Sequence, residues 1–316
     1  MPKIVTNRPL ILRALGTLLA LFLLIYLLSQ QGWSEISAAI RQIPLWRFVL
    51  AICLMFVSRF SIIARWHTLL RSSGIKIQFS KTARITFAGL FSTNFLPTTV
   101  GGDIIRLAGI IQAGFDATTC TASLIVDRLI GMASMAMAVP FSLPALLSAR
   151  PWIDRTSRPP IFLLTLLMEN LLKNFWHKVR EFIRKVLSAI SLWLKQPVAL
   201  LTSTAWSWLH MLCIFSVQYL FFRGMGEEIS IWKIAGLYSL AYFITLIPIS
   251  INGYGLQELS MTLIFSNFGQ VSINSGLSVA LLFRTLMILA SLPGALFVPD
   301  ILAIQKQPAE EVNQNG

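Results

Sequence analysis

Long runs of apolar residues, separated by short polar stretches, dominate this chain of 316 residues. A helix needs about 20 mainly apolar residues to cross a bilayer. Runs near or above this length cover residues 10–29, 45–70, 118–147, 198–222 and 274–298. The pattern therefore predicts an all-α polytopic membrane protein. Its first run is long and is followed by further spans, so we expect a retained anchor rather than a cleaved signal peptide.

Two shorter apolar segments, residues 84–96 and 234–247, end at Pro97 and Pro248. Proline ends an incoming helix because it lacks an N–H and clashes with the preceding turn. Glycines follow within a few residues and allow the chain to reverse. We therefore expect two re-entrant elements built from broken helices. Irregular backbone at membrane depth is tolerated where it is buried in protein or lines water.

The two breaker segments, residues 96–106 and 247–258, resemble each other. Both contain the pattern Leu/Ile-Pro-x-Thr/Ser-Val/Ile-Gly/Asn-Gly, and a carboxylate follows in each. Their prolines lie 151 residues apart (248 − 97), and Arg128 and Arg284 lie 156 apart (284 − 128). Landmarks that recur in one order at nearly one offset indicate an internal duplication. Paired, interrupted apolar segments in two halves point to a transport site.

Charge predicts the orientation of these segments. Residues 71–84 carry four Lys/Arg and no acid, and residues 148–197 carry nine Lys/Arg against three Asp/Glu. Cytoplasmic loops are enriched in Lys and Arg, so we place both stretches and the N-terminus inside. The loop after Phe222 holds Glu227 and Glu228 and is predicted to lie outside. The two halves are then inverted, with about seven full spans and two re-entrant segments.

Residues 148–197 form a basic linker between the halves. Apolar residues recur there at helical spacing, and Lys and Arg fill much of the rest. This is typical of an amphipathic helix on an anionic membrane surface, although a helix packed on cytoplasmic loops has the same pattern. We thus expect one membrane domain over residues 1–300, with the first span at 10–29, repeat one at 45–147, the linker at 148–197, repeat two at 198–299 and a disordered tail at 300–316.

Composition agrees with this class and excludes several functions. The chain is 55% hydrophobic and 12% charged, with a mean hydropathy of +0.71, whereas soluble domains carry about 25% charged residues. The net charge of +13 has no accompanying nucleic-acid motif. The three cysteines show no metal or disulfide spacing and are predicted to be small buried hydrophobes. No catalytic triad order, metal motif or phosphate loop occurs, so we expect no enzymatic activity, cofactor or metal.

Few charges lie within the apolar territory, and each needs a partner, a wet cavity or an interfacial position. Asp103 and Arg106 are three apart and share a helix face, and Asp103 is also a candidate N-cap. Asp127 and Arg128 are adjacent, so they need different partners. We expect the breaker segments and these charges to bind an anion near the membrane centre, through helix N-termini and arginines. The candidate substrate-binding residues are Thr98, Thr99, Gly101, Gly102, Asp103, Arg106, Asp127, Arg128, Ser250, Asn252, Gly253, Glu258 and Arg284.

Other polar residues are assigned structural roles. Arg59, Arg65 and Trp66 are predicted to anchor the membrane edge. His67 and His210 lack ligand spacing.

These residues resemble a known family. The segments 91–106, 126–131 and 248–258, together with Arg65-Trp66 and Arg284, are similar to the lysylphosphatidylglycerol synthase transmembrane-region family, or flippase-like domain proteins. The likeness covers roughly residues 10–300. The resemblance implies an integral inner-membrane protein of a bacterium or archaeon, with a region assigned to moving lipid between leaflets. Nothing after Val298 is expected to form the soluble aminoacyl-transfer domain, so synthase activity is not implied. Gln257 departs from the Arg expected in many relatives.

Three functions remain open. The first is a lipid translocase that binds an anionic or polar headgroup between the two breaker segments, with membrane lipids as its partners. The second is a small-solute transporter on the same scaffold. The third is a non-transporting subunit that tethers a lipid- or glycan-modifying enzyme, and a homo-oligomer is also compatible with the sequence. Bound lipid in a laterally open groove would favour the lipid translocase. A closed, water-lined central site would favour the solute transporter, and a dry interior would favour the non-transporting subunit.

Overall fold

The computed structural model describes residues 40–96, 101–148, 193, 195–246 and 251–303, and this part of the chain is helical with no strand. The expected first span, most of the linker, and Thr98, Thr99 and Ser250 lie outside it. The helices of the first half are α3 (Leu45–Ser72), α4 (Phe79–Thr93), α5 (Gly101–Gln112) and α6 (Ala117–Ala138), which continues through η1 (Val139–Ser142) into α7 (Leu143–Ser148).

The second half repeats this order of long and short helices. It comprises α10 (Pro197–Gly224), α11 (Ile231–Thr245), η2 (Ile251–Gly253), α12 (Leu256–Gly269), α13 (Ile273–Leu289), η3 (Leu292–Leu296) and α14 (Val298–Ala303). The last helix extends into the region where we expected the tail to begin, and Ile301 is buried.

Four helical stretches within the described residues are long and apolar enough to cross a membrane. They are Leu45–Ser72, Ala117–Ser148, Pro197–Gly224 and Ile273–Leu296. Each begins and ends within a few residues of an apolar run in the sequence, so those four predictions are confirmed. The total of about seven spans stays a prediction, because residues 1–39 and 149–192 lie outside the described part.

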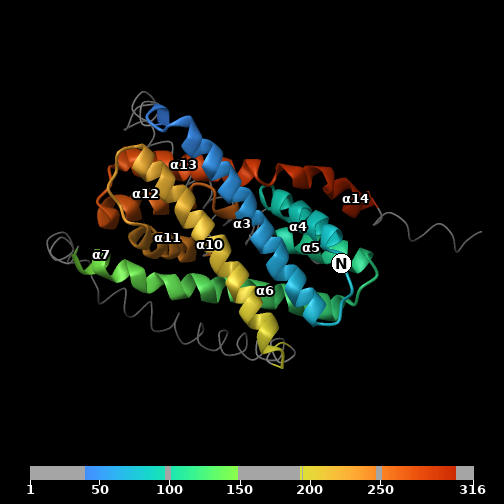
Figure 1. Ribbon diagram of the computed structural model, residues 1–316. Helices are drawn as coiled ribbons and strands as arrows, with labels where there is room; N and C mark the ends of the chain where they lie inside the picture. The colour runs from blue at the N-terminus through green and yellow to red at the C-terminus, as the bar shows by residue number, and fades with distance from the viewer. Residues whose placement is uncertain (1–39, 97–100, 149–192, 194, 247–250, 304–316) are drawn as a thin grey trace, which may run out of the picture.

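The shorter helices pack in pairs, α4 against α5 and α11 against α12. Figure 1 shows the first pair towards one end of the molecule and the second pair towards the other. Helices α4 and α11 have 15 residues each, which at 1.5 Å per residue is roughly 22 Å and less than the hydrocarbon thickness of about 30 Å. Neither member of a pair spans a bilayer alone.

The two halves are joined along two kinds of contact. Helices α3 and α10 pack along much of their length, as Figure 1 shows in blue and yellow. In addition, α4 packs on η3 and α11 packs on η1, so each short helix lies on the broken end of the other half's long helix. Glycine permits both approaches: a Cβ on Gly236 would clash with the backbone of Ser142, and one on Gly294 with the carbonyl of Phe87.

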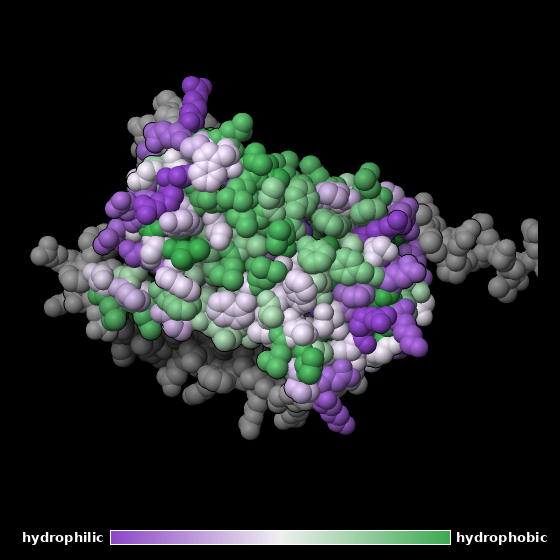
Figure 2. Space-filling view, viewed as in Figure 1, coloured by the Kyte–Doolittle hydropathy of each residue, from purple (hydrophilic) through white to green (hydrophobic). Residues whose placement is uncertain are grey.

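The outer surface is apolar over the middle of the molecule. Figure 2 shows hydrophobic residues over the central region of this face and hydrophilic ones concentrated towards its two ends. Large exposed side chains include Val49 and Phe56 of α3 and Leu201 of α10. Such a surface is what a bilayer solvates. The prediction that the cysteines are buried is right for Cys120 and Cys213 and wrong for Cys53, which is exposed on this apolar surface of α3.

Candidate functional site

A buried ion cluster joins α3, α5 and α6. Arg65 Nε donates to Asp127 Oδ1 at 2.7 Å, and Arg106 donates from Nη1 and Nη2 to Asp127 Oδ2 at 3.2 Å. Arg65 also donates to Ser207 Oγ of α10 at 2.8 Å, and the guanidinium of Arg106 lies over the Trp66 ring at 4.2 Å. Asp127 is 1% exposed, so its charge depends on these two arginines.

The same cluster continues to the first breaker segment. Arg106 donates to Asp103 Oδ1 at 3.1 Å, and Arg128 Nε donates to Asp103 Oδ2. The predicted i,i+3 pair is therefore present, and the neighbours Asp127 and Arg128 do bind different partners. Asp103 lies in the first turn of α5, which begins at Gly101, so the prediction that it could be the N-cap is wrong.

A second buried ion pair lies at the other breaker segment. Arg284 of α13 donates from Nε to Glu258 Oε1 and from Nη2 to the Gly253 carbonyl at 3.2 Å. Its guanidinium lies 4.8 Å from the centre of the Tyr254 ring. Glu258 is 3% exposed, and its Oε2 has no hydrogen-bond partner among the described residues.

The glycines of the two breaker segments are required for different reasons. Gly253 has a φ of +70°, which favours glycine, and Asn252 beside it is also left-handed at +49°. Gly102 has no positive φ. Instead, a Cβ there would clash with Thr93 Oγ1 and approach the Gly89 carbonyl to 2.6 Å. Gly102 therefore permits α4 and α5 to pack closely, and a Cβ on Gly101 would similarly clash with Leu96.

A cavity of about 240 Å³ lies between the two halves. We call it the central cavity. Helices α3, α4 and α6 of the first half and α10, α11 and α13 of the second contribute to its wall. Its polar lining residues are Arg59, Thr93, Asn94, His210, Tyr238, Tyr242, Thr245, Asn252, Gln257, Arg284 and Ser291. Apart from the two arginines these side chains are polar and neutral or weakly basic, and no Asp or Glu is among the described residues that line the cavity.

Only part of the predicted site lines this cavity. Asn252, Gly253 and Arg284 do. The predicted residues that are absent from its lining are Gly101, Gly102, Asp103, Arg106, Asp127, Arg128 and Glu258. We expected five charges to converge on one cavity, namely Asp103, Arg106, Arg128, Glu258 and Arg284. The structure instead arranges them in two groups, one at each breaker segment, and of these five only Arg284 lines the central cavity. The reason is mutual satisfaction, since the carboxylates and arginines of each group neutralise one another within it.

The prediction that Arg59, Arg65 and Trp66 anchor the membrane edge is wrong. They are 4%, 8% and 0% exposed, respectively, and Arg59 lines the central cavity. Sequence reasoning placed them at an edge because arginine and tryptophan are common there. One signal could have corrected it: Arg65 lies within an apolar run and needs a carboxylate at the same depth, which Asp127 supplies.

Hydrogen bonds beside the central cavity join the two halves. Tyr254 Oη donates to the Asn94 carbonyl at 3.1 Å, and Asn94 Nδ2 donates to Ser291 Oγ at 2.8 Å. Ser58 Oγ and His210 Nδ1 are 2.7 Å apart and join α3 to α10. The two bonds of Asn94 bring the end of α4, just before the first breaker segment, against the second breaker segment and the end of α13.

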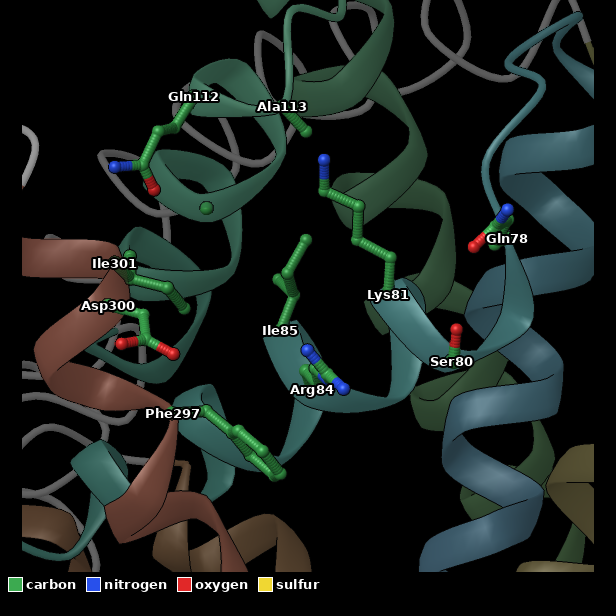
Figure 3. A pocket seen from close by; sticks show the side chains of 11 residues that line it. Gln78, Ser80, Lys81, Arg84, Ile85, Gln112, Ala113, Phe297, Asp300 and Ile301 are labelled. Atoms are coloured by element: carbon green, nitrogen blue, oxygen red, sulfur yellow. The ribbon is translucent and has the colours of Figure 1, made fainter.

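A second pocket, of about 490 Å³, lies at the surface between α4, α5 and α14. Figure 3 shows Lys81 on its right-hand side and Gln112 and Asp300 on its left, with Arg84 below. Arg84 also lies 5.8 Å from the centre of the Phe297 ring. This pocket shares no residue with the central cavity. Within the part of the chain that the structure describes, no group of three His, Cys, Asp or Glu residues could hold a metal ion.

The sequence that forms these apolar spans, breaker segments and ion pairs matches the model of a known family. The profile of the lysylphosphatidylglycerol synthase TM region covers residues 13–294. The chain belongs to this family. It is accordingly a multi-pass membrane protein, and both breaker segments and both ion groups lie within the matched residues. No curated protein matches the sequence.

Proposed function

We propose that this protein is a lipid translocase, which moves an anionic or polar-headgroup lipid between the two leaflets of the cell membrane. The observation that carries the proposal is the central cavity. It lies between the halves, it is lined by the buried cations Arg59 and Arg284, and the described residues of its lining include no carboxylate. Family membership supports a membrane domain with a lipid-related, flippase-like role.

Cavity size favours a headgroup over a whole lipid. Pockets for drug-sized ligands measure roughly 300–1,000 Å³, whereas this one measures about 240 Å³. It can accommodate a headgroup but not two acyl chains. The chains would remain in the bilayer, against the apolar outer surface of the helices.

An inverted repeat is part of the proposal, and matching contacts support it. In each half, the carboxylate of the breaker segment pairs with an arginine on the next long helix. Asp103 pairs with Arg128 at a separation of 25 residues, and Glu258 with Arg284 at 26. Each short helix also packs on the other half's broken long helix. Two re-entrant elements of opposite orientation would give the alternating access that such repeats provide.

Orientation follows from charge, as a further part of the proposal. The basic loop at 71–84 and the basic linker lie inside, the acidic loop at Glu227 lies outside, and the N-terminus is cytoplasmic. The proposal assigns no catalytic residue, metal or cofactor.

The test is a leaflet assay. The purified protein is reconstituted into vesicles containing a fluorescent phosphatidylglycerol, and a membrane-impermeant quencher reports how much lipid reaches the outer leaflet. We expect faster exchange than in protein-free vesicles and in vesicles with a heat-inactivated sample. The assay is repeated with fluorescent lipids that have neutral and cationic headgroups. Equal exchange rates in vesicles with active protein, with heat-inactivated protein and without protein, for every headgroup, would refute the proposal. Uptake of a small solute without lipid exchange would instead identify a solute transporter.

A further inference from the structure

Arg59 is a buried cation that has no acidic partner among the described residues. It lies fourteen residues after Leu45 (59 − 45), midway along the 28 residues of α3. It is 4% exposed, and its Nη2 donates to the Met287 carbonyl of α13 at 3.2 Å. Its Nε is buried and has no hydrogen-bond partner among the described residues. A guanidinium at this depth has been desolvated without the compensation that buried charges normally receive.

The other buried arginines of the described helices differ in this respect. Arg65 and Arg106 share Asp127, and Arg284 pairs with Glu258. No described carboxylate lies within ion-pair distance of Arg59. The sequence supplies partners for the other three and leaves this one facing the central cavity, whose wall it forms.

The charge and shape of the Arg59 guanidinium indicate which ligand would bind there. Glu258 neutralises Arg284, so among the described residues of the cavity wall one positive charge, on Arg59, is uncompensated. A ligand with one negative charge matches this best. Guanidinium N–H groups bind the oxygens of a phosphate in a fork, which a point charge cannot do. Hydroxyl and amide groups of Tyr238 and Gln257 line the same space and can hydrogen-bond further polar groups.

We propose that Arg59 is the anion-binding residue of the central cavity and that its ligand is a phosphodiester monoanion. The site's role in transport rests on the translocase function proposed above, but the site itself does not. A phosphodiester of this charge can belong to a lipid such as phosphatidylglycerol, or to a water-soluble glycerophosphodiester. Either would place its phosphate between Arg59 and the polar side chains around it.

Arg47 provides a matched control on the same helix. Its Nη1 donates to the Leu220 carbonyl at 3.2 Å, its Nε also lacks a partner among the described residues, and it does not line the central cavity. Arg47 is half-buried, and Arg47→Met removes a charge and a carbonyl contact from the same helix without touching the site. Arg59→Met removes the charge from the site. Arg59→Lys keeps the charge but loses the bidentate hydrogen-bond geometry of the guanidinium.

The experiment measures binding of phosphatidylglycerol, diacylglycerol and glycerophosphoglycerol to the detergent-purified full chain, by native mass spectrometry with titration. We expect the wild type and Arg47→Met to bind phosphatidylglycerol alike and diacylglycerol weakly. Loss of a hydrogen-bonded charge contact should weaken phosphatidylglycerol binding by about tenfold to a hundredfold in Arg59→Met. Arg59→Lys should be intermediate. Thermal unfolding of each variant verifies that it is folded. If Arg59→Met does not fold, Arg59→Lys alone tests the site.

The outcomes separate the site from the function. Equal phosphatidylglycerol affinity in the wild type, Arg47→Met and both folded Arg59 variants would overturn the site. Arg59-dependent binding of glycerophosphoglycerol, without binding of the lipid, would support the site and identify a water-soluble ligand. Arg59-dependent lipid binding by a protein that gives no exchange in the vesicle assay would leave the site standing and refute the translocase function.

Discussion

Among single residues, the Glu258–Arg284 pair offers the sharpest test of stability. Arg284 satisfies both Glu258 and the Gly253 carbonyl, and both side chains of the pair are at least nine-tenths buried. Arg284→Met would leave Glu258 as an uncompensated buried charge, and we expect it to destabilise the protein by about 3–5 kcal/mol. Thermal unfolding in detergent measures this. Arg284→Lys should recover only part, because one ammonium cannot reproduce both contacts of the guanidinium.

Arg223 is the control for that experiment. Its side chain is 45% exposed and lies 3.7 Å from Glu228, which is 91% exposed. Exposed pairs contribute about 0–1 kcal/mol, so Arg223→Met should barely change the melting temperature. If Arg284→Met were equally mild, the buried pair would not stabilise the second breaker segment.

Contacts between charged residues could be predicted when the partners are close in the sequence, and not when they are far apart. The Asp103–Arg106 contact spans three residues, so helical geometry alone predicts it. Arg65 and Asp127 are 62 residues apart, and Arg59 reaches Met287 across 228. Nothing local specifies such pairings. The sequence therefore identified most of the buried charges, but it could not assign all their partners or show that Arg59 has no acidic partner in the described part of the chain.

The short helices are held together by glycine, and this is testable at the level of elements. Helices α4 and α5 approach where Gly102 faces Gly89, with no room for a methyl group. Gly102→Ala should force the pair apart, lowering the melting temperature by several degrees and the folded yield. Gly276→Ala is the comparison, because Gly276 of α13 has no positive φ and the nearest atom to its missing Cβ is at 3.4 Å, an ordinary van der Waals distance. An effect of Gly102→Ala no larger than that of Gly276→Ala would mean that close packing is not what requires glycine at position 102.

The start of α6 should respond to pH. Asp116 caps this helix by accepting hydrogen bonds from the Thr119 backbone N–H and hydroxyl, at 2.7 and 2.8 Å. These bonds hold the pKa of the Asp116 carboxyl below its ordinary value. A depressed pKa stabilises the fold above the unfolded-state value of about 3.9, and the contribution is lost as pH falls through the folded value.

Asp116→Asn isolates that effect. Asparagine caps helices about as well as aspartate but does not titrate there. We expect similar melting temperatures for the two proteins at pH 6 and a larger fall for the wild type between pH 5 and pH 2. Parallel curves for both proteins over that interval would show that the cap has no pH dependence.

Element positions were the most predictable feature, because run length and proline placement are local properties. The four long helices and the short α4 and α11 begin and end within a few residues of the predicted segments, apart from an earlier start of α4 at Phe79. The packing of α4 on η3 and of α11 on η1 could not be predicted. It depends on Gly236 and Gly294, whose significance is visible only when the opposing backbone is in place.

For the whole molecule, the inversion of the two halves is decided by labelling. Lys76 and Glu228 lie in corresponding, exposed loops of the two halves. In right-side-out vesicles, a cysteine at position 228 should react with a membrane-impermeant thiol reagent, and one at position 76 should react only after permeabilisation. The cysteine-free parent is the blank. Labelling of position 76 but not 228 from outside would reverse the orientation, and labelling of both or neither would remove the inversion.

Transport by alternating access further requires the halves to move against each other. Phe141 of η1 and Trp232 of α11 join the halves at the surface, with ring centres 5.2 Å apart. Phe60 and Phe79 form a similar exposed pair within the first half, at 5.5 Å. None of the four lines the central cavity. We replace each pair by cysteines in a chain lacking Cys53, Cys120 and Cys213, and join the thiols with a short, reductively cleavable reagent.

Joining positions 141 and 232 should stop lipid exchange in the vesicle assay, because the short helix of one half could no longer shift on the broken helix of the other. Cleaving the reagent should restore it. Joining positions 60 and 79 should have a much smaller effect, since both lie within one half. The physical reason is that rocking of repeats changes contacts between halves and largely preserves those within them. Full exchange with the 141–232 link in place would mean that lipid crosses without movement at this contact.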